Sequence, residues 1–432
     1  MFETKKEKET NKMVKKPTTG MKDIMPYEMQ VRDYVTGLVK EVYGGFGFQS
    51  IETPAVESIE NLSSKQGGEN EKLIFKILKR GEKLNLETAS CEADLVDSGL
   101  RYDLTVPLSR YYSAHANELP SPFKALQMGP VWRADRPQKG RFRQFVQCDI
   151  DILGDASYLA EIELITATTT LLSKLGFKNF TVRINDRKML KAMASYAGFE
   201  ESEFDNVFII LDKMDKIGID GVKEDLINNG YNAESVEKYM DLYANVSGDI
   251  AGIEYLKNTL GDYLPAETVE SLETIIEAAL SIKATDFNIE FDPTLVRGMS
   301  YYTGTIFEIS MDEFGSSVAG GGRYDEMIKK FTGNDTPACG FSIGFERIIT
   351  ILVDKQFKVP TEGVKYALLI EKGADKDHIC KVMQEATELR KIGASVLVSW
   401  MNKNKKFQKQ QLISEGYKEE NIKDYYCTEF RK

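Results

Sequence analysis

The alternation of apolar and polar positions is clearest in the stretch "RFRQFVQCDID", which ends at Asp151. One parity is apolar and consists of Phe142, Val146, Cys148 and Ile150. The other parity is polar and consists of Arg141, Arg143, Gln147, Asp149 and Asp151. This period of two predicts a strand with one face in the core. Its polar face is basic at the start and acidic at the end, a surface suited to a ligand with two chemically different ends.

Helical spacing of apolar residues predicts two long helices in the first half of the chain, at 28–47 and 156–176. The first stops at the Gly44-Gly45 pair, which is a good helix stop signal. A strand is expected at 180–186. The segment 187–285 is helical and acidic and contains no chemical motif, so we predict a helical insertion there.

Shorter elements are expected between the first helix and the opening strand. The segment 48–57 is extended and interrupted by Pro54, and the segment 71–86 has the pattern of a hairpin turning at Arg80-Gly81. The segment 99–116 runs from a strand through Pro107 into a helix.

Strand signals resume after the helical segment, and a small domain is expected at the C-terminal end. The expected strands lie in 287–296, 301–310, 316–327 and 339–353, the last running into a helix. Residues 354–364 have the composition of a linker, and a strand, helix and strand then follow as a βαβ unit. The sequence therefore predicts an α+β catalytic domain (16–186 and 286–355) with a mostly antiparallel sheet, the helical insertion (187–285), a small C-terminal α/β domain (364–432) and a polar lead-in (1–15).

Composition limits the functional classes. The chain has 432 residues, 42% of them hydrophobic, which favours two or three globular domains, and no apolar run approaches the roughly 18 residues of a membrane span. The five cysteines form no CxxC pair, which favours reduced thiols in the cytoplasm over a disulfide framework or a zinc site. Two histidines argue against a His-ligated metal or a Ser/His catalytic pair.

Charge argues mildly against a non-specific nucleic-acid binder, because the net charge is −11. Local distribution differs from the total, since the segment 402–411, "NKNKKFQKQQ", carries four lysines and no acidic residue. Alone, such a segment is usually a solvated helix face.

The arginines raise the question of phosphate chemistry. The chain has neither a P-loop nor a G-x-G-x-x-G motif after a strand. "AGGGRYD" (319–325) fits either a tight strand-to-helix turn or a backbone that approaches a flat ligand closely. Arg133, Arg297 and Arg347 each lie beside apolar or small residues, where an unpaired charge is costly. Since a guanidinium pairs bidentately with phosphate oxygens, these three could hold a triphosphate.

Other polar residues fit the second half of such a ligand. The acidic end of the opening strand, with Asp103 and Thr105 of "RYDLT", could accept hydrogen bonds from an ammonium group or a protonatable ring. Tyr301 and Tyr302 supply aromatic walls with hydroxyl groups. Phosphate binders beside amine binders suit an amino acid being joined to a nucleotide.

Five separated motifs resemble those of one enzyme family and occur in that family's order. "GPVWRADRPQKGRFRQFVQCDIDI" and "GFSIGFERI" are similar to the second and third signature motifs of class II aminoacyl-tRNA synthetases. "LVRGMSYYTGTIFE" and "AGGGRYD" resemble the two motifs peculiar to histidyl-tRNA synthetases, and "LRYDLTVPL" resembles that family's histidine-binding strand. The resemblance runs from about Lys16 to the C-terminus. It implies an antiparallel class II catalytic sheet and a C-terminal anticodon-binding domain.

The resemblance also implies substrates and residue roles. The substrates would be L-histidine, tRNA(His) and ATP with its Mg²⁺, with no protein-only metal site, and the enzyme would be a cytoplasmic homodimer formed partly near 44–57. Arg297, in place of a metal, and Arg133 would be catalytic, and ATP would contact Arg133, Arg141 and Arg347. Histidine would contact Asp103, Leu104, Thr105, Arg133, Gln147, Asp151, Arg297, Tyr301 and Tyr302. Arg136 and Gln138 would meet the tRNA acceptor end, including its extra 5′ guanosine.

Two features depart from that family's pattern. Ser300 stands where the family usually has an acidic or amide residue, so it receives no role. The family normally adds another strand pair after "SWMNKNKKFQKQQL", so the anticodon domain is expected to be shortened.

The expected activity is histidine–tRNA ligation through histidyl-adenylate, with specificity from Asp151. The main alternative is the synthetase-like regulatory subunit of ATP phosphoribosyltransferase, which shares the fold but generally lacks the anticodon domain and has eroded motifs. A nucleotide- or tRNA-binding module without activity is a further alternative. Arg133, Gln147, Arg297 and Arg347 are all present here, which favours the enzyme.

Overall fold

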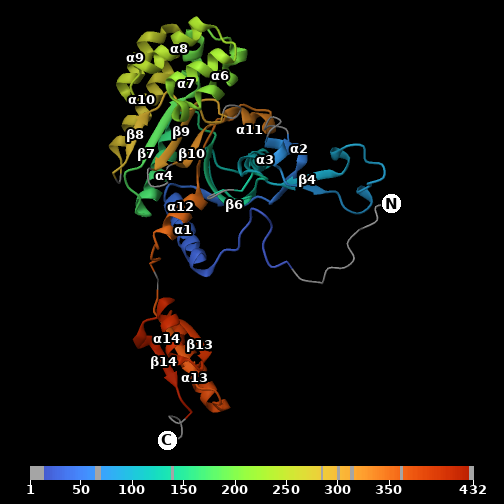
Figure 1. Cartoon of the computed structure of the whole chain (residues 1–432), viewed down its shortest axis with the longest axis vertical. Helices are drawn as coiled ribbons and strands as arrows, with labels where there is room; N and C mark the ends of the chain where they lie inside the picture. The colour runs from blue at the N-terminus through green and yellow to red at the C-terminus, as the bar shows by residue number, and fades with distance from the viewer. Residues whose placement is uncertain are drawn as a thin grey trace. The chain divides into compact units, whose positions relative to one another are not determined.

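The computed structural model describes residues 14–63, 70–137, 141–283, 286–298, 302–311, 316–360 and 363–427 (Figure 1). The chain forms two compact units, Met1–Phe357 and Lys358–Lys432. The boundary between them lies inside the segment expected to be a linker.

An eight-stranded sheet forms the centre of the first unit, in the order β1-β5-β6-β11-β10-β9-β7-β8. Its strands are β1 (Gln49–Ile51), β5 (Phe123–Trp132), β6 (Gln144–Leu153), β7 (Thr181–Asp186), β8 (Asn288–Phe291), β9 (Thr305–Met311), β10 (Ser316–Arg323) and β11 (Ala338–Ile343). The outermost pairings, β1 with β5 and β7 with β8, are parallel, and the pairings between them are antiparallel. The predicted mostly antiparallel sheet is therefore confirmed.

Helices in the first unit include α1 (Pro26–Gly45), α3 (Thr105–His115), α4 (Leu159–Lys174), α11 (Asp325–Thr332) and α12 (Phe345–Asp354). In α1, Pro26 occupies the start of the helix, where its missing N–H costs no hydrogen bond, and the buried valines Val31, Val35, Val39 and Val42 recur at helical spacing. This apolar stripe explains why α1 packs against α4 and α12, while α4 packs against β6 and β11. Both long helices predicted from spacing are confirmed.

The segment predicted to be a helical insertion is helical. It contains α5 (Arg187–Ala197), α6 (Phe204–Leu211), α7 (Met214–Asn228), α8 (Ala233–Asn245), α9 (Ile250–Leu260) and α10 (Ala266–Ser281). These helices lie together in the green-to-yellow part of the first unit (Figure 1). Because α10 packs against α4, β7 and β8, and α5 packs against β7, the segment is attached to one end of the central sheet.

A three-stranded antiparallel sheet, β2-β4-β3, lies beside the central one and corrects one expectation. Its strands are β2 (Val56–Ser58), β3 (Lys76–Leu78) and β4 (Val96–Leu100), and α2 (Ile59–Ser63) follows β2. The predicted hairpin at Arg80-Gly81 is wrong, because β3 pairs with β4 and a short 3₁₀ turn, Gly81–Lys83, follows. A short apolar run does not reveal which strand will supply its hydrogen-bond partners. The break at Pro54 is confirmed, since β1 and β2 belong to different sheets.

The second unit is a small α/β domain. It contains β12 (Lys365–Ile370), α13 (Lys376–Lys391), β13 (Ser395–Trp400), α14 (Lys405–Ser414) and β14 (Ile422–Tyr425). β12 pairs in parallel with both β13 and β14, as a βαβ unit requires. The predicted strand–helix–strand order is confirmed. Across the described ranges of both units, none of the helices has the length and apolar character needed to cross a membrane.

Candidate active site

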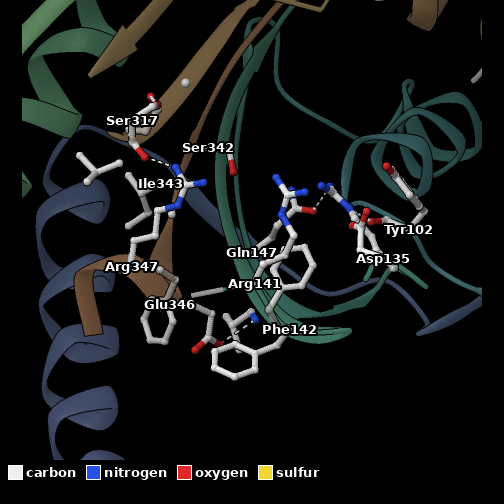
Figure 2. A pocket seen from close by; sticks show the side chains of 18 of the residues that line it. Tyr102, Asp135, Arg141, Phe142, Gln147, Ser317, Ser342, Ile343, Glu346 and Arg347 are labelled. Atoms are coloured by element: carbon white, nitrogen blue, oxygen red, sulfur yellow. Dashed lines mark hydrogen bonds between the residues drawn. The ribbon is translucent and has the colours of Figure 1, made fainter. Parts of the chain in front are cut away.

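A cavity of about 520 Å³ lies over the middle of the central sheet. Its walls come from β6, β10, β11, the start of α12 and the segments on either side of Arg133 and Arg297. In Figure 2, Arg347 and Ser317 lie on one side of this cavity, Tyr102 and Asp135 lie on the other, and Gln147 lies between them. Four arginines reach its surface, namely Arg133, Arg141, Arg297 and Arg347. Such a concentration of guanidinium groups suits an anionic ligand.

Arg133 is fixed in place before any ligand arrives. Its Nε donates to the carbonyl of Tyr102 at 3.1 Å, and its Nη2 donates to Gln147 Oε1 at 3.1 Å. The guanidinium carbon lies 4.3 Å from the centre of the Tyr102 ring and 5.1 Å from that of Phe145. Two rings and two hydrogen bonds therefore define its orientation, which is what a group that must meet one phosphate position needs.

Arg297 and Arg347 meet at a single residue of β10. Arg297 Nη2 donates to the Ser317 hydroxyl at 2.8 Å, and Arg347 Nη1 donates to the Ser317 carbonyl. Arg297 also forms an ion pair with Glu308 through its Nε. Burial lowers the pKa of Arg347, and the nearby positive charges of Arg297 and Arg141 lower it further. The site thus holds like charges close together, an arrangement that a polyphosphate would relieve.

The acidic half of β6 is more buried than its alternating pattern suggested. From Cys148 onward both parities are buried, so Asp149 and Asp151 are only 4% and 3% exposed. Burial raises the pKa of Asp149 to about 6, although the carboxylate accepts a hydrogen bond of 2.9 Å from Gln147 Nε2. Asp149 is therefore connected to the cavity through Gln147. Arg143, at the basic end of the same polar parity, donates from its Nε to the carbonyl of Asp135.

Asp151 on β6 is paired across the sheet with β11. Its Oδ1 accepts a hydrogen bond of 2.5 Å from the Tyr324 hydroxyl, and its buried Oδ2 has no hydrogen-bond partner among the described residues. Gly340, its partner on β11, leaves room for the carboxylate, because a Cβ there would lie 2.0 Å from Oδ1. Burial raises the pKa of Asp151 well above its usual value, and the charge of Asp149 raises it further.

Tyr302 is influenced by the charges of these carboxylates. It lines the cavity beside Arg297, and burial raises the pKa of its hydroxyl. The charges of Asp149 and Asp151 act on the same hydroxyl and raise its pKa further. Tyr302 is therefore an aromatic part of the cavity wall that feels the charges of the buried acids.

Three expected histidine contacts lie behind the cavity surface. Asp103, Leu104 and Thr105 are buried and outside the cavity lining. Asp103 Oδ1 accepts from the backbone N–H of Val106 at 3.0 Å and so caps the start of α3, and the Leu104 carbonyl accepts from Gln127 at 3.2 Å. The negative charge of Asp103 nevertheless acts on Asp149 and Asp151 and contributes to raising the pKa of each.

The remaining expected residues are less closely grouped. Arg141 is exposed and reaches the cavity, whereas Arg136 is exposed and lies outside its lining. Gln138, Ser300 and Tyr301 fall outside the described residues. The structure thus brings Arg133, Arg141, Gln147, Arg297, Tyr302 and Arg347 to one cavity.

The stretch "AGGGRYD" contains the tight strand-to-helix turn of the first interpretation, because β10 ends at Arg323 and α11 begins at Asp325. The three glycines themselves lie inside β10, before this turn. A Cβ on Gly320 would lie 2.5 Å from Arg297 Nη1, so the absence of a side chain at Gly320 lets the guanidinium pack against β10. The group that approaches the backbone here is a protein side chain.

Sequence reasoning missed several residues that support the site. Glu346, in the quoted "GFERI", accepts from Arg32 Nη1 and from the backbone N–H of Val146, each at 3.1 Å, which ties the start of α12 to α1 and β6. Ser317, Tyr324 and Glu308 support Arg297 or Asp151. Glu308 and Tyr324 lie inside motifs named above and Ser317 inside the strand expected at 316–327, but their partners are far away in the chain and no spacing pattern reveals such pairs.

Comparisons with known proteins agree on one family. A model of the family described as histidyl-tRNA synthetase matches residues 20–348. A histidine–tRNA ligase of Leifsonia xyli subsp. xyli is 46% identical over 78% of this chain and 80% of its own. The crystal structure of the histidyl-tRNA synthetase from Nostoc sp. PCC 7120 superposes with a TM-score of 0.77 at 28% identity, covering 94% of this chain and 90% of that one.

A second solved structure resembles the chain in fold alone. It is the crystal structure of an ATP phosphoribosyltransferase regulatory subunit/histidyl-tRNA synthetase from Bacillus halodurans C. It has a TM-score of 0.77 at 21% identity, and covers 96% of this chain and 99% of its own.

Proposed function

The chain belongs to the histidyl-tRNA synthetase family, and we propose that it activates L-histidine with ATP and transfers it to the 3′ end of tRNA(His) in the cavity described above. The observation that carries this proposal is the arrangement of four arginines around one cavity, which Tyr302 also lines and from which Gln147 leads to the buried carboxylate of Asp149. The arginines of the cavity suit the phosphates of ATP, and the buried carboxylates suit the ammonium and imidazole groups of histidine.

In the first step, the histidine carboxylate attacks the α-phosphorus of ATP, and pyrophosphate leaves. Negative charge grows on the α-phosphate oxygens in the transition state, and Arg297 and Arg133 are the groups that stabilise it. Arg141 and Arg347 hold the outer phosphates. The protein supplies position and positive charge and needs no nucleophile of its own, so the restraints on Arg133 and Arg297 are part of the catalytic design.

In the second step, the 3′-terminal ribose hydroxyl of the tRNA attacks the carbonyl carbon of histidyl-adenylate, and AMP leaves. We assign the acceptor end of the tRNA to the exposed Arg136 and to Gln138. The C-terminal unit would bind the anticodon.

Histidine would be recognised from the buried end of β6. Gln147, with Asp103 and Thr105, would hold the ammonium and carboxylate groups, while Asp151 and a tyrosine of the pair Tyr301-Tyr302 would contact the imidazole. A buried carboxylate with one free oxygen is a strong discriminator, because a substrate that lacks a ring N–H leaves it unpaired. Leu104 would contribute packing behind the amino acid.

The donor set of the cavity fits phosphate better than it fits a metal ion. Its charged side chains are mainly arginines, and Glu346 is engaged by Arg32 and Val146. We therefore assign the Mg²⁺ to the ATP molecule with which it binds, where it would neutralise phosphate charge. We also propose that the chain acts as a cytoplasmic homodimer, with residues 44–57 in the dimer interface.

The test is histidine-dependent exchange of pyrophosphate into ATP, followed by charging of tRNA(His). We expect exchange with histidine and background exchange with the other amino acids, then histidyl-tRNA formation. A protein that binds ATP and histidine but catalyses neither reaction would have the properties of a regulatory subunit and would contradict the proposal.

A further inference from the structure

Arg297 is held by groups that none of the proposed substrate contacts includes. Its side chain is 36% exposed and it comes from an irregular segment after β8, so the backbone alone gives it little restraint. Three neighbours on the central sheet surround its guanidinium, namely Glu308 on β9 and Ser317 and Gly320 on β10.

The register of the sheet puts two of these neighbours side by side. Glu308 and Gly320 are directly paired across β9 and β10. The guanidinium lies over Gly320, where a Cβ would come within 2.7 Å of its central carbon, and its Nε meets the Glu308 carboxylate. A glutamate beside a glycine thus forms a slot for one arginine.

Ser317 closes the other end of the slot. Its hydroxyl accepts from Arg297 Nη2 at 2.8 Å and donates to the carbonyl of Ala319 at 2.9 Å, so the hydroxyl is itself oriented. The register of β10 against β9 shifts between Ser317 and Ala319, and this bulge turns Ser317 toward the arginines. Its carbonyl accepts from Arg347.

Glu308 is available for this task because its other neighbour is engaged elsewhere. Arg183 on β7 is paired with Glu308 across the strands, but its guanidinium forms ion pairs with Asp292 and Asp215. On its far side Arg183 is paired with Glu290 of β8. Two glutamates therefore flank Arg183, and Glu308 is the one that forms an ion pair with Arg297.

Glu308 also offsets repulsion within the arginine cluster. The positive charges of Arg297 and Arg141 lower the pKa of Arg347, and the negative charge of Glu308 acts in the opposite direction. The carboxylate meets Nε and the Ser317 hydroxyl meets Nη2, so two of the three guanidinium nitrogens are held from one side each.

From this geometry we propose that Glu308, with Ser317, is a positioning residue that fixes the guanidinium of Arg297 for adenylate formation. This inference rests on the proposed function. Glu308 acts through Arg297 and touches no substrate. Its removal should therefore slow the adenylation step itself, with little effect on substrate binding or on the transfer to tRNA.

The experiment measures single-turnover histidyl-adenylate formation by the full-length protein and its Glu308→Gln variant. Losing a hydrogen bond to a charged group should lower the adenylation rate by about tenfold to hundredfold. The KM values for ATP and histidine should stay within about threefold, as should transfer from preformed histidyl-adenylate to tRNA(His). Equal losses in both steps, or no loss in adenylation, would overturn the proposal.

Glu290→Gln is the matched control, because it removes the same charge from the other side of Arg183. Glu290→Gln should leave adenylation unchanged. An equal loss of adenylation in this variant would show that any removal of charge near Arg183 has the same effect, which would contradict the proposal. Gly320→Ala is a second route to the same result, since its methyl group would displace the guanidinium and slow the same step. Normal adenylation in Gly320→Ala would contradict the claim that packing over Gly320 fixes the Arg297 guanidinium.

A double-mutant cycle with Arg297→Lys separates positioning from a structural role. If Glu308 acts only through the guanidinium, Glu308→Gln should cost less than about threefold in the Arg297→Lys background. If the losses in adenylation rate of Glu308→Gln and Arg297→Lys multiply in the double variant, the proposal is overturned. If the unaltered protein makes no histidyl-adenylate, the proposed function fails instead. Crystal structures then still decide the inference, because the Arg297 guanidinium should move in Glu308→Gln and remain in place in Glu290→Gln.

Discussion

Tyr324 and Asp151 are joined by a hydrogen bond of 2.5 Å from the tyrosine hydroxyl to Asp151 Oδ1. The two residues are 173 positions apart in the chain and are both buried, so the bond fixes the carboxylate without help from solvent. Its direction leaves Oδ2 as the oxygen that can receive a ligand proton. The specificity proposed for Asp151 therefore depends on Tyr324 as well.

Replacing Tyr324 with Phe removes this bond and keeps the ring. We expect the KM for histidine to rise about tenfold, because the carboxylate loses its orientation, while the KM for ATP stays nearly constant. Steady-state pyrophosphate exchange at varied histidine and varied ATP concentration measures both. Tyr239→Phe is the control, since Tyr239 is also fully buried and its hydroxyl bonds Tyr243 in the helical segment. A rise in the histidine KM in both variants would remove the special role of Tyr324.

Asp149 makes stability depend on pH. Its pKa is raised from 3.8 to about 6, mainly by burial, so the folded state binds its proton more tightly than the unfolded state. The resulting stabilisation is complete below about pH 4 and is lost as the pH rises to about 6. The shift corresponds to about 3 kcal/mol.

Urea unfolding from pH 4 to pH 7 tests this with the Asp149→Asn variant. The free energy of unfolding of the unaltered protein, minus that of the variant, should fall by about 2 kcal/mol over this range, since part of the stabilisation is already lost at pH 4. Asp186 also has a pKa of about 6, but it is present in both proteins and cancels in the difference. A difference that does not change with pH would show that Asp149 ionises normally.

The lysine-rich segment 402–411 is divided by the structure into two kinds of lysine. Lys405 and Lys409 form ion pairs with Asp424 at 2.6 and 2.8 Å, whereas Lys403 and Lys406 are exposed. If the second unit contacts tRNA phosphates, the exposed pair should make most of the contribution, because the other two share the negative charge of Asp424.

The double variant Lys403→Ala/Lys406→Ala should weaken tRNA(His) binding and flatten its dependence on salt. We expect the slope of log K against log salt to decrease by about 1 to 2, with adenylate formation unchanged. Lys405→Ala/Lys409→Ala is the charge-matched comparison and should change the slope less. An unaltered slope in the first variant would make these lysines a solvated helix face.

Local patterns predicted the elements well where one periodicity dominates. The valines of α1 specify a helix because they form one buried stripe, and the alternation before Asp151 specifies a strand although only its second half, from Cys148 onward, is fully buried. The alternation could not show that Asp149 and Asp151 are themselves buried, since that follows from what covers them. Gly340 and Tyr324, which make room for Asp151 and bond it, come from strands and turns far along the chain.

Pairing between distant segments accounts for most of what the sequence did not reveal. The expected hairpin at Arg80 fails because β4 is the partner of β3. Glu308 was one acidic residue in a quoted strand, and only the register of β9 against β10 puts it beside Gly320. Motif resemblance identified the arginines of the cavity, whereas the groups that hold them required the fold.

The measurement that tests the account most directly is histidine-dependent ATP–pyrophosphate exchange by the Arg297→Ala variant. In the proposed mechanism, Arg297 is the main source of positive charge at the α-phosphate. Exchange should therefore fall by about a hundredfold to a thousandfold, while circular dichroism and thermal unfolding remain close to those of the unaltered protein. Near-normal exchange in a folded Arg297→Ala variant would contradict the account, because the α-phosphate would then be stabilised by other groups.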